Sequence, residues 1–209
     1  MIGFVENPLL EAIFPSKCGL CGRFGPAICD NCMSEFQALD STPKPGSDAV
    51  DITISLFNYC TRAEQAVHRL KYDRITSLVR PLAKLMRSGY DHQRLERFDL
   101  VIPVPIHWRR WMLRGFNQSL YLSEGMPRGK VRTNVLYRIK ATRPQVGLTR
   151  EQRALNMRGA FSANDKANGR SVLLIDDVST SGNTAEQCAI ALKEKGCTEV
   201  GLLTLTGSN

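Results

Sequence analysis

The sequence predicts an α/β fold in which helices surround a parallel sheet and a small four-cysteine unit precedes it. Short apolar runs without helical periodicity, such as Val172–Ile175, alternate with helix-like segments, which is typical of strands buried on both faces of a parallel sheet. Two Cys-x-x-Cys pairs stand ahead of the first such run. A chain of 209 residues with 43% hydrophobic residues is long enough for one α/β core and a small appendage.

The first part of the chain is predicted to form a short helix, Phe4–Phe14, followed by a metal-binding unit. Each Cys-x-x-Cys turn can direct two thiolates at one tetrahedral ion, and Gly22 leaves room for the chain to fold round it. Disulfides and a redox role are the alternatives for this spacing. We therefore expect a structural zinc ion at Cys18, Cys21, Cys29 and Cys32.

A linker is predicted at residues 40–51, which are rich in Pro, Ser, Thr and Asp. The expected organisation is an N-terminal helix and zinc finger over residues 1–39, this linker, and a main domain over 52–209. No apolar run has the length of a membrane span, and the first fifteen residues hold two glutamates instead of a basic stretch. We therefore expect a cytoplasmic protein.

The main domain opens with an alternating strand, Ile52–Tyr59, and two helical segments, Arg62–Lys71 and Ile75–Met86. Pro81 favours a start of the second helix just ahead of it. Phe98–Pro105 is a second predicted strand, buried and closed by two prolines. Its rigid closing turn can present backbone amides to a ligand.

A loop is predicted at Arg114–Ser119, where Asn117 caps a short helix that runs through Leu122. A short strand at Val135–Lys140 then leads into the basic segment Arg143–Phe161. This segment is expected to form either a mobile loop over a ligand or a solvated basic helix.

The functional prediction depends on the strand, loop and helix that follow. Val172–Ile175 leads into Asp176-Asp177 and the loop Ser179–Thr184, then into a helix, and Val200–Leu205 forms the last strand. Ligands of open α/β sheets bind at the carboxyl ends of strands, and a helix N-terminus offers free amide hydrogens to an anion. The loop is therefore expected to hold a phosphate, and the acids to hold paired ribose hydroxyls. The alternative is that two acids simply end a strand ahead of a capped helix.

Charge is concentrated in the middle of the chain, whose formal net charge is +8. Residues 106–160 carry twelve lysines and arginines against two glutamates. A basic region beside a phosphate site suits a polyanionic small substrate and nucleic acid equally. Trp108 and Trp111 would offer stacking faces to single-stranded bases.

The thirteen residues Val172–Thr184 resemble the phosphoribosyl pyrophosphate (PRPP) signature of type I phosphoribosyltransferases. Where that family usually has Thr-Gly-Gly-Thr, this chain has Ser-Gly-Asn-Thr. The resemblance implies a type I phosphoribosyltransferase-like parallel sheet and magnesium bound together with PRPP, mostly through substrate oxygens and water. It also implies a ribose and 5-phosphate site made of Asp176, Asp177, Ser179, Thr180, Ser181, Gly182, Asn183 and Thr184.

The Val-Pro-Val-Pro turn resembles the pyrophosphate loop of amidophosphoribosyltransferases, with their following acid and hydroxyl replaced by Ile-His-Trp-Arg-Arg. This resemblance implies that pyrophosphate is contacted by Val104, Pro105, His107, Arg109 and Arg110. The segment Arg143–Phe161 resembles the hood loop of type I phosphoribosyltransferases. It implies leaving-group stabilisation by Arg150 and Arg153, which join Asp176 and Asp177 as expected catalytic residues.

Together with the cysteine pairs, the proline turn and the acid pair, the string Arg-Gly-Phe-Asn-Gln at 114–118 makes the chain resemble the ComF family of competence-associated proteins, from Cys18 to about Leu205. That resemblance implies a role in natural DNA uptake, with a helicase-like partner and single-stranded DNA. Three functions stay open: a phosphoribosyltransferase with an unknown acceptor, a single-strand DNA-binding accessory, and a PRPP-sensing regulator without chemistry.

Overall fold

The computed structural model describes residues 15–40, 42–59, 61–93, 95–141, 150–179 and 182–208, so the predicted helix Phe4–Phe14 lies outside the described residues. The described α-helices are α2 (Asp30–Ser34), α3 (Arg62–His68), α4 (Val79–His92), α5 (Trp108–Arg114), α6 (Gln118–Leu122), α7 (Arg150–Met157) and α8 (Asn183–Lys193). The described strands are β1 (Lys44–Pro45), β2 (Ile52–Asn58), β3 (Leu100–Pro103), β4 (Leu136–Arg138), β5 (Phe161–Ala163), β6 (Ser171–Ser179) and β7 (Glu199–Gly207).

The main sheet has five strands in the order β1-β2-β7-β6-β3. Strands β2, β7, β6 and β3 are parallel to one another, and β1 pairs antiparallel with the outer edge of β2. Ala38 also bridges Phe57 on that edge. Strands β4 and β5 form a separate antiparallel pair. The predicted α/β class with a parallel sheet is confirmed.

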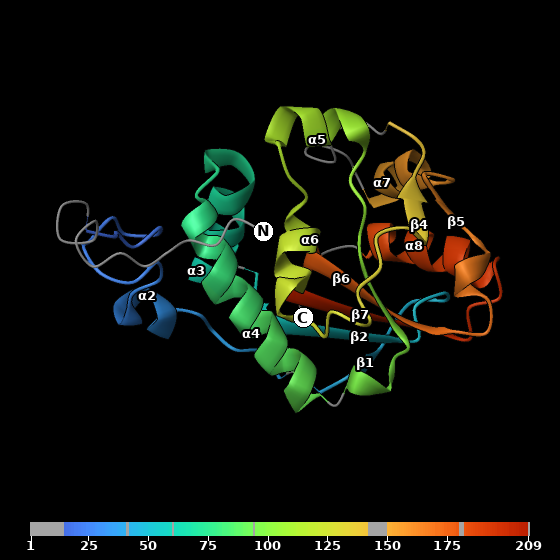
Figure 1. Cartoon of the computed structure of the whole chain (residues 1–209), viewed down its shortest axis with the longest axis horizontal. Helices are drawn as coiled ribbons and strands as arrows, with labels where there is room; N and C mark the ends of the chain where they lie inside the picture. Colours follow the sequence, from blue (N-terminus) through green and yellow to red (C-terminus); the bar gives the residue numbers. More distant parts are fainter. Residues whose placement is uncertain are drawn as a thin grey trace.

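Helices cover both faces of the sheet, with α3 and α4 on one side and α8 on the other (Figure 1). Successive side chains of β6 point to opposite faces, as the pleat of a strand requires. Leu173 and Ile175 belong to the apolar cluster under α3 and α4, whereas Val172 and Leu174 belong to the cluster under α8. All four are fully buried, which explains why the sequence shows one continuous apolar run here.

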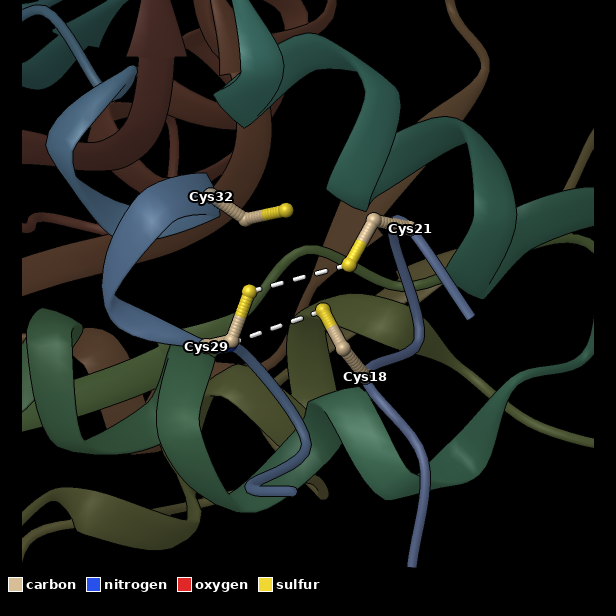
Figure 2. Close-up of side chains that lie close together, drawn as sticks. All are labelled: Cys18, Cys21, Cys29 and Cys32. Carbon is tan, nitrogen blue, oxygen red and sulfur yellow. Dashed lines mark hydrogen bonds between the residues drawn. The ribbon is translucent and has the colours of Figure 1, made fainter. Parts of the chain in front are cut away.

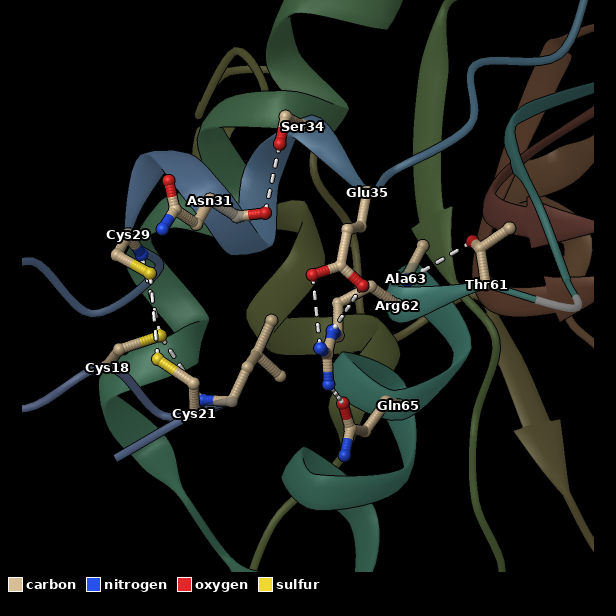
Figure 3. Close-up of polar contacts among 11 residues, drawn as sticks. Cys18, Cys21, Cys29, Asn31, Ser34, Glu35, Thr61, Arg62, Ala63 and Gln65 are labelled. Atoms are coloured by element: carbon tan, nitrogen blue, oxygen red, sulfur yellow. Dashed lines mark hydrogen bonds and ion pairs between the residues drawn. The ribbon is translucent and has the colours of Figure 1, made fainter. Parts of the chain in front are cut away.

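The four-cysteine unit packs on the same core as α3 and α4. Leu20, Ile28 and Phe36 are buried in that apolar cluster. Glu35, just after α2, accepts two hydrogen bonds of 3.1 Å from the guanidinium of Arg62 at the start of α3 (Figure 3). The unit is therefore attached to the main domain by apolar contacts and by this ion pair.

Helix α5 projects from the fold at the top of Figure 1, and its sequence did not predict it as a helix. None of its residues is buried. Trp108, Trp111, Met112 and Leu113 are all more than half exposed. Within the described parts of the chain, no helix combines the length and apolar character needed to cross a membrane.

Candidate functional site

The four cysteines of the N-terminal unit come together in space, as their spacing predicted. Their sulfur atoms all lie within 4.8 Å of one another (Figure 2). The Sγ atoms of Cys21 and Cys29 are 3.7 Å apart, which matches the sulfur–sulfur separation of about 3.8 Å in a tetrahedral site with Zn–S bonds near 2.3 Å. Gly22 has a φ of 76°, so this glycine supplies the left-handed residue that turns the chain after the first pair.

The environment of the thiols also fits a metal ion. The backbone N–H groups of Leu20 and Cys29 donate to Cys18 Sγ. Burial would raise the pKa of Cys18, yet the backbone hydrogen bonds outweigh it and lower that pKa to about 6. Burial and the neighbouring thiols raise the pKa of Cys32 to about 12. Four clustered thiols cannot all lose their protons without a nearby positive charge. A divalent cation would supply that charge.

The second candidate site is a cleft of about 900 Å³ at the carboxyl ends of the parallel strands. The end of β6, the turn after β3 and the start of α8 all contribute to it, because parallel strands end at the same edge of a sheet. It is lined by the predicted residues Val104, Pro105, His107, Arg109, Arg110, Asp176, Asp177, Ser179, Gly182, Asn183 and Thr184. Thr180 and Ser181 lie outside the described residues.

The acid pair forms the floor of the cleft. Asp176 Oδ1 accepts hydrogen bonds of 2.9 Å from Ser119 Oγ and from the backbone N–H of Asp177. Asp177 Oδ1 lies 2.7 Å from Lys71 Nζ. Burial, followed by the charge of Asp177, raises the pKa of Asp176 from 3.8 to about 7, although Lys71 and the hydrogen bonds act in the opposite direction. The pair therefore carries less than two negative charges near neutral pH.

Strand β6 and helix α8 enclose the predicted phosphate loop. The strand runs on past the acids to Ser179, because its backbone pairing with β7 continues that far. Gly182 has a φ of 69° and is the N-cap residue of α8, so this glycine takes the left-handed conformation at the start of the helix. Asn183 and Thr184 are the first residues of the helix, at the positive end of its dipole, which favours an anion.

The proline turn after β3 lies beside the acids because Val104 N–H donates to Ile175 O, the residue before the pair. Asn117 Nδ2 donates to Val104 O at 3.1 Å, which ties the Arg-Gly-Phe-Asn-Gln string to this turn. His107 caps α5, and its Nδ1 accepts from Arg109 N–H. Burial and the neighbouring arginines lower the pKa of His107.

Cationic groups line one wall of the cleft. Burial and then Arg110 lower the pKa of Arg138, on β4, to about 10. Partial burial and then Arg114 lower the pKa of Arg110. Arg114 thus disfavours the charged form of Arg110, and Arg110 disfavours that of Arg138. A bound anion would offset this repulsion between positive charges. Gln118 Nε2 is buried on the same wall and has no hydrogen-bond partner among the described residues.

Several cleft residues were not found from the sequence, namely Tyr59, Lys71, Tyr72, Arg74, Arg114, Gln118, Ser119 and Arg138. Gln118 and Ser119 belong to the string whose motif was recognised, so that motif was the available signal for them. Lys71 and Arg138 carried no such signal. The backbones of Arg150 and Arg153 lie in α7, but their side chains are outside the described part of the chain.

The fold and its two candidate sites define an α/β protein with a parallel sheet, a cleft at the carboxyl ends of its strands and a four-cysteine unit. No family model matches the chain. Competence protein F of Haemophilus influenzae is 29% identical over 197 residues, which cover 88% of this chain and 81% of that protein. The DNA utilization protein YhgH of Escherichia coli O6:H1 is 28% identical over 191 residues, covering 88% of this chain and 79% of that protein.

Competence protein ComFC of Bacillus subtilis is 25% identical over 189 residues, covering 90% of this chain and 75% of that protein. These relatives support the ComF family as the family of this chain, in agreement with its motifs. Among solved structures, the allosteric regulatory enzyme of purine biosynthesis is similar with a TM-score of 0.40 and 20% identity, over 61% of this chain and 26% of that chain.

Proposed function

We propose that this chain binds PRPP in the cleft and acts in DNA uptake as a ComF-type protein. The observation that carries the proposal is that one cleft contains an acid pair, a helix N-terminus preceded by a left-handed glycine, and a wall of arginines. These are the groups that a ribose diol, a 5-phosphate and a pyrophosphate require. The names of the relatives, which refer to competence and DNA utilization, support the biological role.

The residues divide the ligand between them. Asp176 and Asp177 accept hydrogen bonds from the ribose hydroxyls, and these bonds strengthen as positive charge develops at the anomeric carbon. The amide hydrogens at the start of α8 hold the 5-phosphate. Arg110 and Arg138 lie where they can offset the charge of the pyrophosphate. Magnesium, when it is bound with PRPP, neutralises pyrophosphate oxygens.

Calorimetric titration tests the proposed ligand. PRPP with magnesium is expected to bind the wild type, and Asp177→Asn is expected to weaken binding by about tenfold to a hundredfold, because a hydrogen bond to a charged group is lost. Asp99→Asn is a matched control, since Asp99 binds Ser171 at the opposite edge of the sheet. Absence of PRPP binding to the wild type would refute the proposal.

Isotope exchange separates a transferase from a sensor. A transferase is expected to exchange labelled pyrophosphate into PRPP or to hydrolyse PRPP slowly, and Asp176→Asn and Asp177→Asn are expected to abolish both activities. If the wild type binds PRPP and shows neither reaction with a broad panel of acceptors, the regulator without chemistry is favoured.

Single-stranded DNA is a second candidate ligand, because α5 exposes Trp108 and Trp111 beside Arg109. Binding measured by fluorescence anisotropy is expected to weaken steeply with salt, and Trp111→Ala to cost about 1–3 kcal/mol. Arg170→Gln, at the opposite end of β6, is a control for loss of charge. Binding that is insensitive to salt would contradict this candidate. A helicase-like partner remains a prediction from the ComF resemblance.

Zinc is the proposed occupant of the cysteine cluster. Elemental analysis is expected to find one zinc ion per chain, and Cys21→Ser is expected to lower that content. Cys21 is exposed, so its loss removes a ligand with little loss of packing. Clearly less than one zinc ion per chain in carefully prepared protein would argue against the site.

A further inference from the structure

A single turn of π-helix, η1 (Arg69–Asp73), connects three parts of the molecule. It continues directly from α3 and ends at Arg74, whose φ of 55° makes it the one non-glycine residue with a left-handed backbone in the described part of the chain. π-Helical turns are rare, and they occur frequently at functional sites. A left-handed non-glycine residue costs free energy, so the surrounding contacts must hold this turn in place.

The side chains of the turn make those contacts. Arg69 Nη1 donates to Gly19 O, inside the first Cys-x-x-Cys pair, at 3.0 Å. Lys71 Nζ reaches Asp177 Oδ1 at 2.7 Å, and Arg74 Nη2 donates to Leu113 O in α5 at 2.5 Å. One turn therefore touches the cysteine unit, the acid pair and the exposed helix.

Packing against the cysteine unit leaves the turn little freedom. A Cβ atom added to Gly19 would lie 2.8 Å from Leu78 Cδ2 and 3.0 Å from Ile75 Cγ2. The backbone of the cysteine unit at Gly19 is therefore in close contact with Ile75 and Leu78, which follow the turn. A displacement of the unit would be transmitted to Lys71 through this contact and through Arg69.

Lys71 is well placed to set the charge of the cleft floor. Its side chain is 21% exposed and that of Asp177 is 9% exposed, so the ion pair is largely shielded from water. Two adjacent carboxylates in a partly buried site need a nearby cation. Among the described residues, Lys71 supplies this cation, with its Nζ in direct contact with Asp177 Oδ1.

We propose that Lys71 is a positioning residue of the cleft, the fixed counter-ion of the acid pair, and that the cysteine unit holds it there through Arg69. The lysine acts whatever ligand the cleft binds. The expected effect of metal removal on Lys71 rests on the zinc site proposed above. The hydrogen bond between Arg69 and Gly19 O does not depend on that proposal.

Uptake of Mn²⁺ alone, followed by electron paramagnetic resonance without any phosphate ligand, tests the counter-ion. Wild type is expected to bind no Mn²⁺ at the acid pair, because Lys71 neutralises it. Lys71→Met is expected to gain one Mn²⁺ site that Asp177→Asn removes again, and Lys71→Arg is expected to resemble wild type. Mn²⁺ prefers oxygen ligands to thiolates, so the cysteine unit does not compete. Equal Mn²⁺ uptake by Lys71→Met and wild type would overturn the counter-ion, since a purely structural ion pair would not change it.

Acylation rates of individual lysines, measured by mass spectrometry, test the anchor. Lys71 is expected to react more than about tenfold faster in Asp177→Asn, in Arg69→Gln and in the chelated protein, because opening a shielded ion pair frees the amine. Lys193 is the matched control: it pairs with Asp51 at 2.9 Å at the other end of the sheet, and its rate is expected to stay constant. Arg69→Gln tests the anchor with the metal in place, even if chelation unfolds the chain. An unchanged Lys71 rate in Arg69→Gln would overturn the anchor.

Discussion

Replacing Asp176 by Asn is expected to stabilise the protein, and the gain is expected to depend on pH. The Asn Oδ1 can still accept from Ser119 Oγ and from Asp177 N–H, so the hydrogen bonds of the floor are retained. The substitution removes the cost of a buried negative charge beside Asp177, which outweighs the attraction to Lys71 that is lost with it. Burial and Asp177 raise the pKa of Asp176 to about 7, from an ordinary value of 3.8.

The direction of the pH effect follows from proton binding. Between about pH 4 and pH 7 the folded protein keeps a proton on Asp176 that the unfolded chain has released, so the stability of the wild type falls as pH rises across this window. A difference of about three pH units at about 1.4 kcal/mol each sets an upper limit of roughly 4 kcal/mol. We expect the free energy of unfolding to rise by about 2 kcal/mol at pH 8. This is less than the limit because Asp176 and Asp177 titrate as a pair, so only part of the shift belongs to Asp176.

Urea denaturation at pH 5, 6, 7 and 8, followed by circular dichroism, measures this difference. Asp99→Asn is a control of opposite sign, because hydrogen bonds from Ser171 lower the pKa of Asp99. That variant is expected to be less stable than wild type at every pH above about 4. A stability difference between Asp176→Asn and wild type that is constant with pH, or a less stable variant at pH 8, would refute the reasoning.

Two further predictions concern the sheet and the cleft floor. Gly201→Ala places a Cβ 2.6 Å from Phe98 Cζ, and we expect an overpacking cost of about 1–3 kcal/mol in urea denaturation, whereas Gly129→Ala, which meets no atom within 4 Å, should change stability little. A cost no larger than that of Gly129→Ala would contradict this. Ser119→Ala removes a hydroxyl that donates to the ionised form of Asp176, so the pKa of Asp176 should rise further in a carboxyl ¹³C NMR titration. A lower or unchanged pKa would show that the hydroxyl does not hold that carboxylate.

The central strand was predictable because its packing leaves a simple pattern. Every residue of Val172–Ile175 is buried, alternately under α3/α4 and under α8, and the sequence shows this as an unbroken apolar run. The point at which β6 ends could not be predicted from its side chains. Its pairing with β7 continues to Ser179 through backbone hydrogen bonds, which do not depend on side-chain character.

Helix α5 illustrates the opposite case. Trp108, Trp111 and Met112 do have helical spacing, but seven residues are too short a pattern to identify a helix from sequence. Lys71 was missed for another reason. Its ion pair joins residues separated by 106 positions, and a single sequence contains no signal for a contact between such distant segments. The acid pair was found from its motif, whereas its counter-ion required the fold.

Residues 37–45 have a practical consequence for any shortened version of this protein. Ala38 and the two residues of β1 occupy the outer edge of β2, and Asp51 accepts from Val200 N–H at 2.7 Å. A fragment that began at Ile52, the predicted start of the main domain, would leave that edge bare. Bare strand edges pair with other chains, so such a fragment is expected to aggregate, whereas one that keeps residues 37–51 retains its cover.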